Sequence, residues 1–229
     1  MTETRVVFLG PSRRLDDAAA RLDARYLPPI RRGDLPRVVA DGASQIGIID
    51  GEFGQSFAVS VMEIRSALRA GVDIFGAASM GALRAAECRS LGMIGIGWIF
   101  DRYADGTFTS DDEVALMFNP MDRRGATIPL ATIRWSLQLA IEEGVLPTWA
   151  GETLLDAARR IGFKTRDESA LLRAVSEAPY EPAMKTLLDF MRRDPLRTDR
   201  KRLDALLLLD AMRQRADNHR ARGRDIRAS

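Results

Sequence analysis

A serine flanked by small residues marks the stretch of this chain that is best suited to chemistry. Residues 76–87 read GAASMGALRAAE, after an apolar run at 71–75 that is typical of a buried parallel strand. Ser79 would then begin a helix, where backbone N–H groups are unpaired and the helix dipole is positive. Small neighbours let another group approach the backbone closely. The stretch therefore predicts a site for an anion, or for an oxyanion formed during a reaction.

Ser79 also has a plain structural interpretation. Serine is a common N-cap of helices, and small residues at a strand-to-helix turn often only permit close packing. The segment 77–81 differs from the G-x-S-x-G turn of hydrolase nucleophiles, because Ala77 stands in place of the first glycine. From the sequence alone, Ser79 can be either a helix cap or a reactive group.

Two carboxylates could supply the proton transfers that such a site needs. Asp50 and Gly51 follow a second apolar run at 45–49, and ligands bind outside the carboxyl ends of strands in open parallel sheets. Glu63 lies on the helix that comes next, where an exposed position is the ordinary interpretation. Either carboxylate could activate Ser79 or a water molecule.

Arg84 and Ser12 each allow a structural and a ligand-binding interpretation. Arg84 follows Ser79 on the same helix and could supply positive charge, and an ion pair with Glu87 is the equally weighted alternative. Ser12 follows a first apolar run at 5–9. It either caps the next helix or brings its turn beside Ser79 at the same edge of a sheet.

The alternation of apolar runs and helical periodicity predicts the fold class. The runs at 5–9, 45–49 and 71–75, separated by helices, indicate a small doubly wound, mostly parallel sheet, followed by an α-helical C-terminal region. Prolines in the segment 26–34 predict irregular structure there. We expect an α/β core domain over residues 1–145 and a helical domain with a basic tail over residues 146–229.

An acidic cluster at 111–113 and an arginine complete the set of candidates. The plain interpretation of Asp112 and its neighbours is a helix start capped by Ser110 or Asp111, and a metal site is less well supported because adjacent acidic residues point in different directions. Arg134 lies in an amphipathic helix predicted over residues 128–141.

Composition excludes several classes of site. Cys88 is the single cysteine, so it can form neither an internal disulfide nor a Cys-x-x-Cys metal site. The single histidine, His219, lies in an arginine-rich tail, which removes His-based zinc sites and, unless the tail folds back, a Ser-His-Asp triad. We expect no metal and no cofactor.

With a net charge of +2, no apolar run of ~18 residues and no evident signal peptide, we expect a cytoplasmic protein without a membrane or nucleic-acid partner.

Several blocks of the sequence resemble the TfuA-like core domain. They occur in order over residues 5 to about 118, and the longest is the block of residues 76–87 that contains Ser79. The blocks are VFLGPS at 7–12, PP at 28–29 with GD at 33–34, IDG-x-F at 49–53, EI at 63–64, GAASMGALRAAE at 76–87, GM at 92–93 and DDEVA at 111–115.

The resemblance implies a role beside a YcaO enzyme, which installs thioamides in peptide backbones with ATP. A TfuA-like partner is expected to hydrolyse the C-terminal thiocarboxylate of a ThiS-like sulfur carrier, which releases sulfide. Some family members accompany gene clusters for trifolitoxin-like natural products, so a precursor peptide is a further expected partner, and a homo-oligomer is compatible with the sequence. Asp112 is expected to reach the Ser79 turn because it lies in a family block.

The residue pattern and the family resemblance together predict the residues of the site. The predicted catalytic residues are Ser79, Arg84, Asp50, Glu63 and Asp112. The predicted substrate-binding residues are Ser12, Gly51, Gly76, Ala77, Ala78, Met80, Gly81 and Arg134.

The chain departs from the family pattern at two positions where a histidine is common. Val61 stands two residues before Glu63, and Met117 and Phe118 follow the block at 111–115. This departure favours an alternative function, in which the chain is a non-catalytic adaptor. It would bind the carrier or the precursor peptide and dock it on a YcaO protein.

Overall fold

The computed structural model describes residues 4–12, 15–54, 56–118, 125–176 and 179–225. Side chains of the last helix are described only as far as 217, without 216, so His219 and most of the basic tail lie outside the described side chains. Contacts divide the chain into two units, Met1–Thr109 with Asp204–Ser229, and Ser110–Leu203. The domain boundary that the sequence predicts between residues 145 and 146 stays a prediction.

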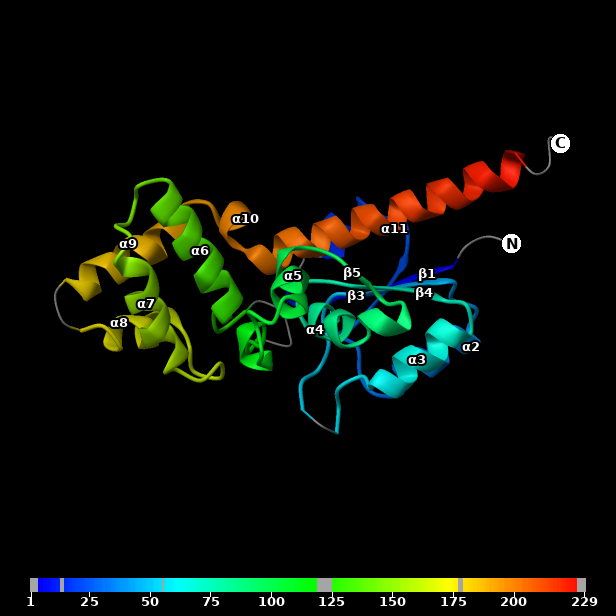
Figure 1. Cartoon of the computed structure of the whole chain (residues 1–229), viewed down its shortest axis with the longest axis horizontal. Helices are drawn as coiled ribbons and strands as arrows, with labels where there is room; N and C mark the ends of the chain where they lie inside the picture. Colours follow the sequence, from blue (N-terminus) through cyan, green and yellow to red (C-terminus); the bar gives the residue numbers. More distant parts are fainter. Residues whose placement is uncertain (1–3, 13–14, 55, 119–124, 177–178, 226–229) are drawn as a thin grey trace. The chain divides into compact units, whose positions relative to one another are not determined.

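The first unit is built on a five-stranded sheet in which all neighbouring strands run parallel (Figure 1). The strand order is β2-β1-β3-β4-β5, so the winding direction reverses between β1 and β3. The predicted doubly wound parallel sheet is thereby confirmed. The strands are β1 (Arg5–Phe8), β2 (Arg25–Leu27), β3 (Gln45–Ile48), β4 (Asp73–Gly76) and β5 (Ile94–Gly95).

Two of these strands were not predicted. Strand β2 pairs with β1 through Arg25, Tyr26 and Leu27, so the expectation of irregular structure is wrong for the last two of these residues. Both β2 and β5 are edge strands of only a few residues. Such strands are partly exposed and too short to show a buried apolar run, which explains why the sequence pattern missed them.

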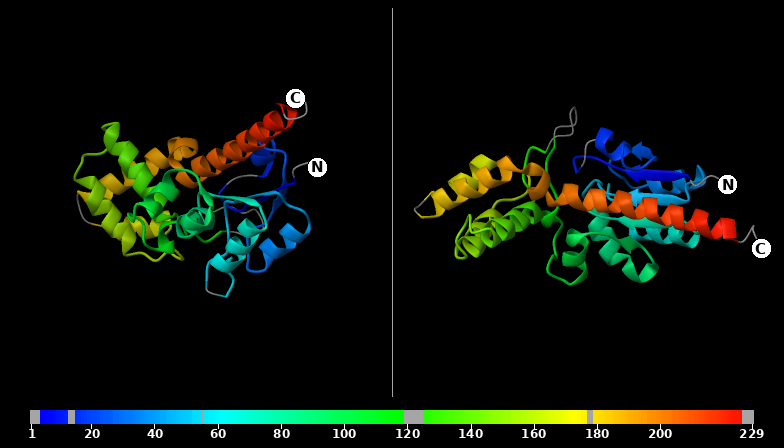
Figure 2. Two further views of the ribbon diagram at one scale, coloured as in Figure 1. Left: turned by 45° about the vertical axis from the view of Figure 1, so that its right-hand side comes forward. Right: turned by 90° about the horizontal axis from the view of Figure 1, so that it is seen from above.

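Helices cover both faces of the sheet (Figure 2). Side chains of β1 alternate between the faces, with Val6 and Phe8 in one apolar cluster and Val7 in the other. Burial on both faces explains why the central strands are apolar throughout. One face is covered by α2 (Asp34–Ala40), α3 (Val61–Arg69) and α4 (Met80–Glu87), and the other by α1 (Leu15–Ala19) and α11 (Arg200–Asp225).

The helix α11 approaches the sheet closely because β3 contains a glycine. A Cβ atom on Gly47 would collide with Met212 and Leu208 of α11. Arg21 also forms a bidentate ion pair with Asp210, with N–O distances of 2.8 and 2.6 Å. The hydrogen bond from Arg21 lowers the pKa of Asp210 below its usual value. The part of α11 around Leu208, Asp210 and Met212 therefore belongs to the α/β core.

An aspartate of α11 also fixes the start of the helix that follows β5. The carboxylate of Asp204 is fully buried and accepts hydrogen bonds from the N–H groups of Trp98 and Ile99, at 3.2 and 2.8 Å. These residues begin α5 (Trp98–Ala104), which follows the 3-10 turn η1 (Arg89–Leu91) and β5. Gly97 precedes the helix with a φ of 94°, and a Cβ atom there would overlap the Asp204 carboxylate. Asp204 thus caps α5 from more than a hundred residues away along the chain.

The second unit is helical around a core of its own, as the periodicity from residue 128 onward predicts. Its acidic cluster forms a 3-10 turn in which the Ser110 hydroxyl accepts a hydrogen bond from the Asp112 N–H, so the predicted cap is confirmed. No helix in the described part of the chain is both long enough and apolar enough to span a bilayer. The elements are η2 (Asp111–Glu113), α6 (Leu130–Glu142), α7 (Ala150–Arg159), α8 (Glu168–Arg173), α9 (Tyr180–Arg193) and α10 (Pro195–Thr198).

Packing of α11 on the sheet gives a first prediction. Leu208 is fully buried in the apolar cluster that includes Val7 of β1 and Phe75 of β4, whereas its neighbour Leu207 is 46% exposed. We expect Leu208→Ala to lower the free energy of unfolding by about 2–5 kcal/mol through lost burial and a cavity. Leu207→Ala should change it by less than about 0.5 kcal/mol. Urea unfolding of both variants measures the difference, and equal values would contradict the packing of α11.

Candidate functional site

Ser79 follows a strained turn at the carboxyl end of β4. Its N–H donates to the Ala77 carbonyl at 2.7 Å, which closes a three-residue γ-turn around Ala78. Ala78 has a φ of 66° and is the one residue other than glycine with positive φ in the described ranges. A conformation of this kind costs about 1–3 kcal/mol and is often found at functional sites.

The Ser79 side chain does not cap α4. It is 2% exposed and makes no capping hydrogen bond, and within the described ranges its hydroxyl has no hydrogen-bond partner. Buried hydroxyl groups are normally hydrogen-bonded. The cap interpretation of Ser79 therefore does not hold, and the hydroxyl is left available to a ligand.

Some of the backbone N–H groups at this turn are also available. The N–H of Ala77 donates to the Ile48 carbonyl at 3.1 Å, and that of Gly81 reaches the Ile49 carbonyl at 3.4 Å. Those of Ala78 and Met80 have no acceptor among the residues that the structure describes. The turn thus offers two N–H donors and one hydroxyl, fewer backbone donors than a free helix start would have.

The glycines of the turn serve a packing role. A Cβ atom on Gly81 would overlap the carbonyl oxygen of Ile48, and one on Gly76 would overlap the carbonyl oxygen of Gly81. The closest neighbour at each of these glycines is therefore a backbone oxygen of the protein itself, and at Gly76 the side chains of Met93 and Ala85 lie close as well. Their substrate-binding role stays a prediction.

Asp50 holds the turn after β1 in place. Its carboxylate accepts hydrogen bonds from the N–H groups of Gly10 and Ser12, at 2.8 and 3.0 Å, and from the Ser12 hydroxyl at 2.6 Å. Both side chains are buried. The two turns meet between β1 and β3, where the strand order reverses and ligands bind in sheets of this class. Asp50 and Ser12 thus lie together at the carboxyl edge of the sheet, as predicted, and the Asp50 carboxylate is hydrogen-bonded to the turn after β1.

Gly51 joins this edge to the Ser79 turn. A Cβ atom on Gly51 would collide with the side chain of Met80, the first residue of α4, and with Ile30. The loops after β1, β3 and β4 are therefore in contact through Asp50, Gly51 and Met80. The sequence predicted that they share one edge of the sheet.

Glu63 forms the capping box of α3. Its carboxylate accepts from the N–H and the hydroxyl of Ser60, at 2.9 and 2.8 Å, and the Ser60 hydroxyl accepts from the Glu63 N–H. The second carboxylate oxygen accepts from the N–H of Gly33 at 2.6 Å. Glu63 therefore stabilises the start of α3 and ties it to the turn before α2.

Arg84 forms the ion pair that was its structural alternative. Its Nη1 contacts the Glu87 carboxylate, and its Nε donates to the Val59 carbonyl at 2.8 Å. Arg84 thus links α4 to the segment that precedes α3. Any contribution of its charge to the Ser79 turn stays a prediction.

Asp112 lies in the second unit and is bound there by a buried arginine. Its carboxylate contacts the guanidinium of Arg166, which is fully buried, and accepts from the Phe163 N–H at 3.1 Å. Because Ser79 belongs to the first unit, the expected approach of Asp112 to the Ser79 turn stays a prediction. Arg166 could not be identified from the sequence pattern, since it lies 54 residues from Asp112.

Arg134 is paired within the second unit as well. Its Nε and Nη2 donate to both oxygens of Glu113, at 2.9 and 2.7 Å, and both side chains are largely buried. This bidentate geometry fixes α6 to the acidic turn η2. The substrate-binding role predicted for Arg134 stays a prediction.

Three further features bear on the chemistry. Burial raises the pKa of the Cys88 thiol, and the nearby Glu87 adds to the shift. The described residues contain no cluster of three or more histidine, cysteine or acidic side chains that could hold a metal ion. A groove of about 730 Å³ lies along α4 and α5 and is lined by Leu83, Ala86, Glu87, Arg89, Ser90, Tyr103, Ala104, Phe108 and Thr109, none of which belongs to the Ser79 turn.

A model of the TfuA-like protein family matches residues 50–167, slightly more than half of the chain. The chain belongs to the TfuA-like family. The match includes the Ser79 turn, Glu63, Asp112 and Arg166, and it begins at Asp50. No curated protein matches the chain. TfuA-like proteins are associated with YcaO-dependent thioamidation, which provides the setting for the site.

The free hydroxyl gives a second prediction, on stability. Since Ser79 forms no cap, Ser79→Ala should leave the melting temperature nearly unchanged. Ser60→Ala removes one half of a capping box and should cost about 1 kcal/mol. Thermal unfolding of both variants provides the comparison. A larger loss for Ser79→Ala than for Ser60→Ala would show that Ser79 has a structural role.

The buried thiol gives a third prediction. The raised pKa of Cys88 means that less thiolate is present near neutral pH than for a free cysteine, and the thiolate is the reactive form. Iodoacetamide should therefore label the native chain far more slowly than the urea-unfolded chain at pH 8. Mass spectrometry measures the labelling, and equal rates would contradict the inert role of Cys88.

Proposed function

We propose that this TfuA-like protein hydrolyses the C-terminal thiocarboxylate of a ThiS-like sulfur carrier and releases sulfide for a YcaO enzyme. The observation that carries the proposal is the Ser79 turn, where the hydroxyl of a serine that is 2% exposed has no partner among the described residues and two backbone N–H groups of the same turn have no acceptor there. Family membership supplies the YcaO setting. The substrate is an anion on a glycine-terminated tail, which small residues at the turn suit.

The turn would act on the charge that develops at the substrate carbonyl. Attack on the thiocarboxylate carbon places a second negative charge on a tetrahedral intermediate. The N–H groups of Ala78 and Met80 are the donors proposed for its oxygen. Strain at Ala78 would hold the Ser79 hydroxyl in place before the substrate arrives.

Two nucleophiles fit this arrangement. If Ser79 attacks, an ester forms, the C–S bond breaks and the hydroxyl proton leaves with the sulfur as HS⁻. Water then hydrolyses the ester to the carrier carboxylate, releases one proton and restores the hydroxyl. If water attacks instead, the Ser79 hydroxyl donates a hydrogen bond to the intermediate, and the products are the same.

The carboxylates have supporting roles in this scheme. Asp50 accepts at least three hydrogen bonds from the turn after β1, and Glu63 accepts hydrogen bonds from Ser60 and Gly33, so the oxygens of both carboxylates are engaged. We propose that Asp50 positions the turn of Ser12 beside the Ser79 turn. The departing sulfur can take the proton from Ser79, so that route does not require a separate base.

An adaptor without catalytic activity is the second candidate function. It is favoured by the engaged carboxylates and by Val61, which stands where the family commonly has a histidine. In that case the same edge of the sheet would bind the carrier tail or a precursor peptide and present it to the YcaO partner. Sulfide release separates the two functions, because an adaptor releases none.

The fourth prediction concerns activity. Sulfide released from a purified thiocarboxylated carrier should fall by about 10²–10³-fold in Ser79→Ala, the usual effect of losing one oxyanion-type donor. Cys88→Ala should release sulfide at the normal rate and serves as the matched control. A methylene-blue assay with folded variants measures both. Full activity in Ser79→Ala would exclude the turn as the site, and no release by the unaltered chain would favour the adaptor.

A further inference from the structure

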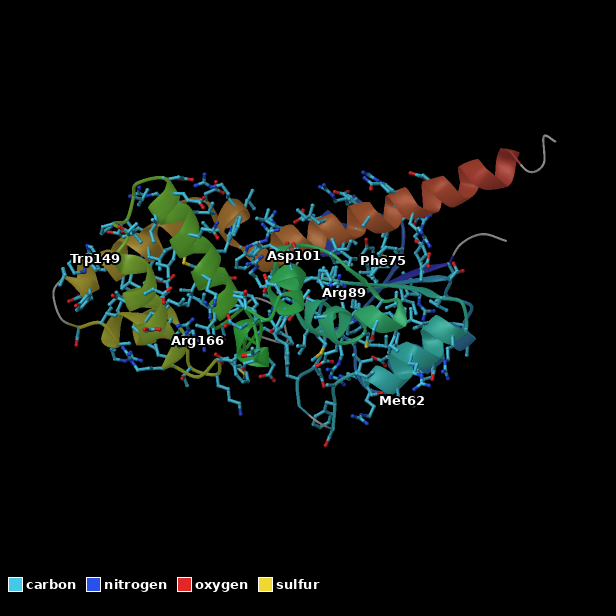
Figure 3. The ribbon with its side chains drawn as sticks, in the orientation of Figure 1. Met62, Phe75, Arg89, Asp101, Trp149 and Arg166 are labelled. Carbon is cyan, nitrogen blue, oxygen red and sulfur yellow. The ribbon has the colours of Figure 1, made fainter. Side chains whose placement is uncertain are left out.

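Large apolar side chains are exposed in one short segment beside the candidate site. Phe57 is 60% exposed, Val61 38% and Met62 63%, all within six residues of chain. Figure 3 shows Met62 at the outer side of α3 in the first unit. We refer to these three side chains as the 57–62 surface. Clustered exposure of this kind marks interaction sites, whereas single exposed apolar residues are ordinary.

The segment that carries this surface is held by hydrogen bonds on both sides. The Phe57 N–H donates to the Gly54 carbonyl at 3.1 Å, and the Phe57 carbonyl accepts from the Arg32 N–H at 2.8 Å. The capping box of Ser60 and Glu63 fixes the start of α3. The apolar side chains are therefore presented by an ordered backbone, and such preorganisation lowers the entropy cost of binding.

The 57–62 surface lies at the same edge of the sheet as the Ser79 turn. Helices α3 and α4 both follow parallel strands and both begin at the carboxyl edge of the sheet. The Nε of Arg84 donates to the Val59 carbonyl at 2.8 Å, which joins α4 to the segment. Arg84 comes five residues after Ser79, about 7.5 Å along a helix axis. A protein that inserts its C-terminal tail at Ser79 would therefore bring its folded body against this surface.

The charges beside the surface are positive. Arg65 and Arg69 follow Met62 at spacings of three and seven residues, so they share its side of α3. Neither has an ion-pair partner among the residues described, whereas the nearby Glu63 carboxylate is engaged by Ser60 and Gly33. The complementary partner surface is apolar with carboxylates at its margin.

We propose that the 57–62 surface docks the folded body of the carrier protein, through an apolar patch bordered by acidic side chains. The identity of this occupant rests on the proposed function. The surface itself contacts no reacting atom, and its role is to hold the carrier while the tail reaches Ser79.

The test measures the affinity of the carrier body, without its tail. The probe is a purified ThiS-like carrier from which the C-terminal diglycine has been removed, titrated by calorimetry. We expect Phe57→Ala with Met62→Ala to weaken its binding at least tenfold. Arg65→Glu with Arg69→Glu should weaken it as well, most strongly at low salt. The control pair Leu91→Ala with Leu207→Ala removes two exposed leucines elsewhere in the first unit and should bind as the unaltered chain does.

Separate outcomes decide the docking surface and the proposed reaction. Unchanged affinity in Phe57→Ala with Met62→Ala would overturn the docking proposal. So would a change in oligomeric state by light scattering without a loss of carrier affinity, since the surface would then join two copies of the chain. The reaction is tested independently with the unaltered chain and the full thiocarboxylated carrier at saturating concentration. Failure to release sulfide from that carrier would exclude hydrolysis and leave the affinity result to decide docking.

Discussion

The first turn of α4 lies directly against the last carbonyl groups of β3, and the candidate site depends on this close approach. Gly81 makes it possible, because any Cβ atom there would overlap the Ile48 carbonyl oxygen. The approach forces the chain from β4 into the γ-turn around Ala78. That turn leaves the Ser79 hydroxyl without a partner in the described structure, at the carboxyl edge of the sheet where Asp50 orders the turn after β1.

The sequence predicted the parts of this structure that repeat a local pattern. Apolar runs at β1, β3 and β4 showed the parallel sheet, because strands buried on both faces are apolar throughout. The position of Ser79 at a strand-to-helix turn followed from the change in periodicity. The fold class predicted that the loops after β1 and β3 lie at the same edge of the sheet. The hydrogen bond from the Ser12 hydroxyl to the Asp50 carboxylate agrees with that prediction.

Pairings between distant segments could not be read from the sequence. Arg166 binds Asp112 across 54 residues, and Asp204 caps α5 across more than a hundred, although each residue is unremarkable in its own segment. The roles of Asp50 and Glu63 were likewise hidden, because a carboxylate that orders a turn and one that activates a nucleophile look the same in sequence. The free hydroxyl of Ser79 depends on one strained residue, Ala78, that local propensity does not favour.

The central claim is that the Ser79 turn binds the anionic end of a glycine-terminated tail. Amide NMR spectra of the labelled chain, titrated with a short peptide that ends in a diglycine carboxylate, test it most directly. The carboxylate should accept from the N–H groups of Ala78 and Met80, so their signals should move furthest and saturate together. Saturating shifts confined to another part of the chain, with these two signals unmoved, would contradict the account.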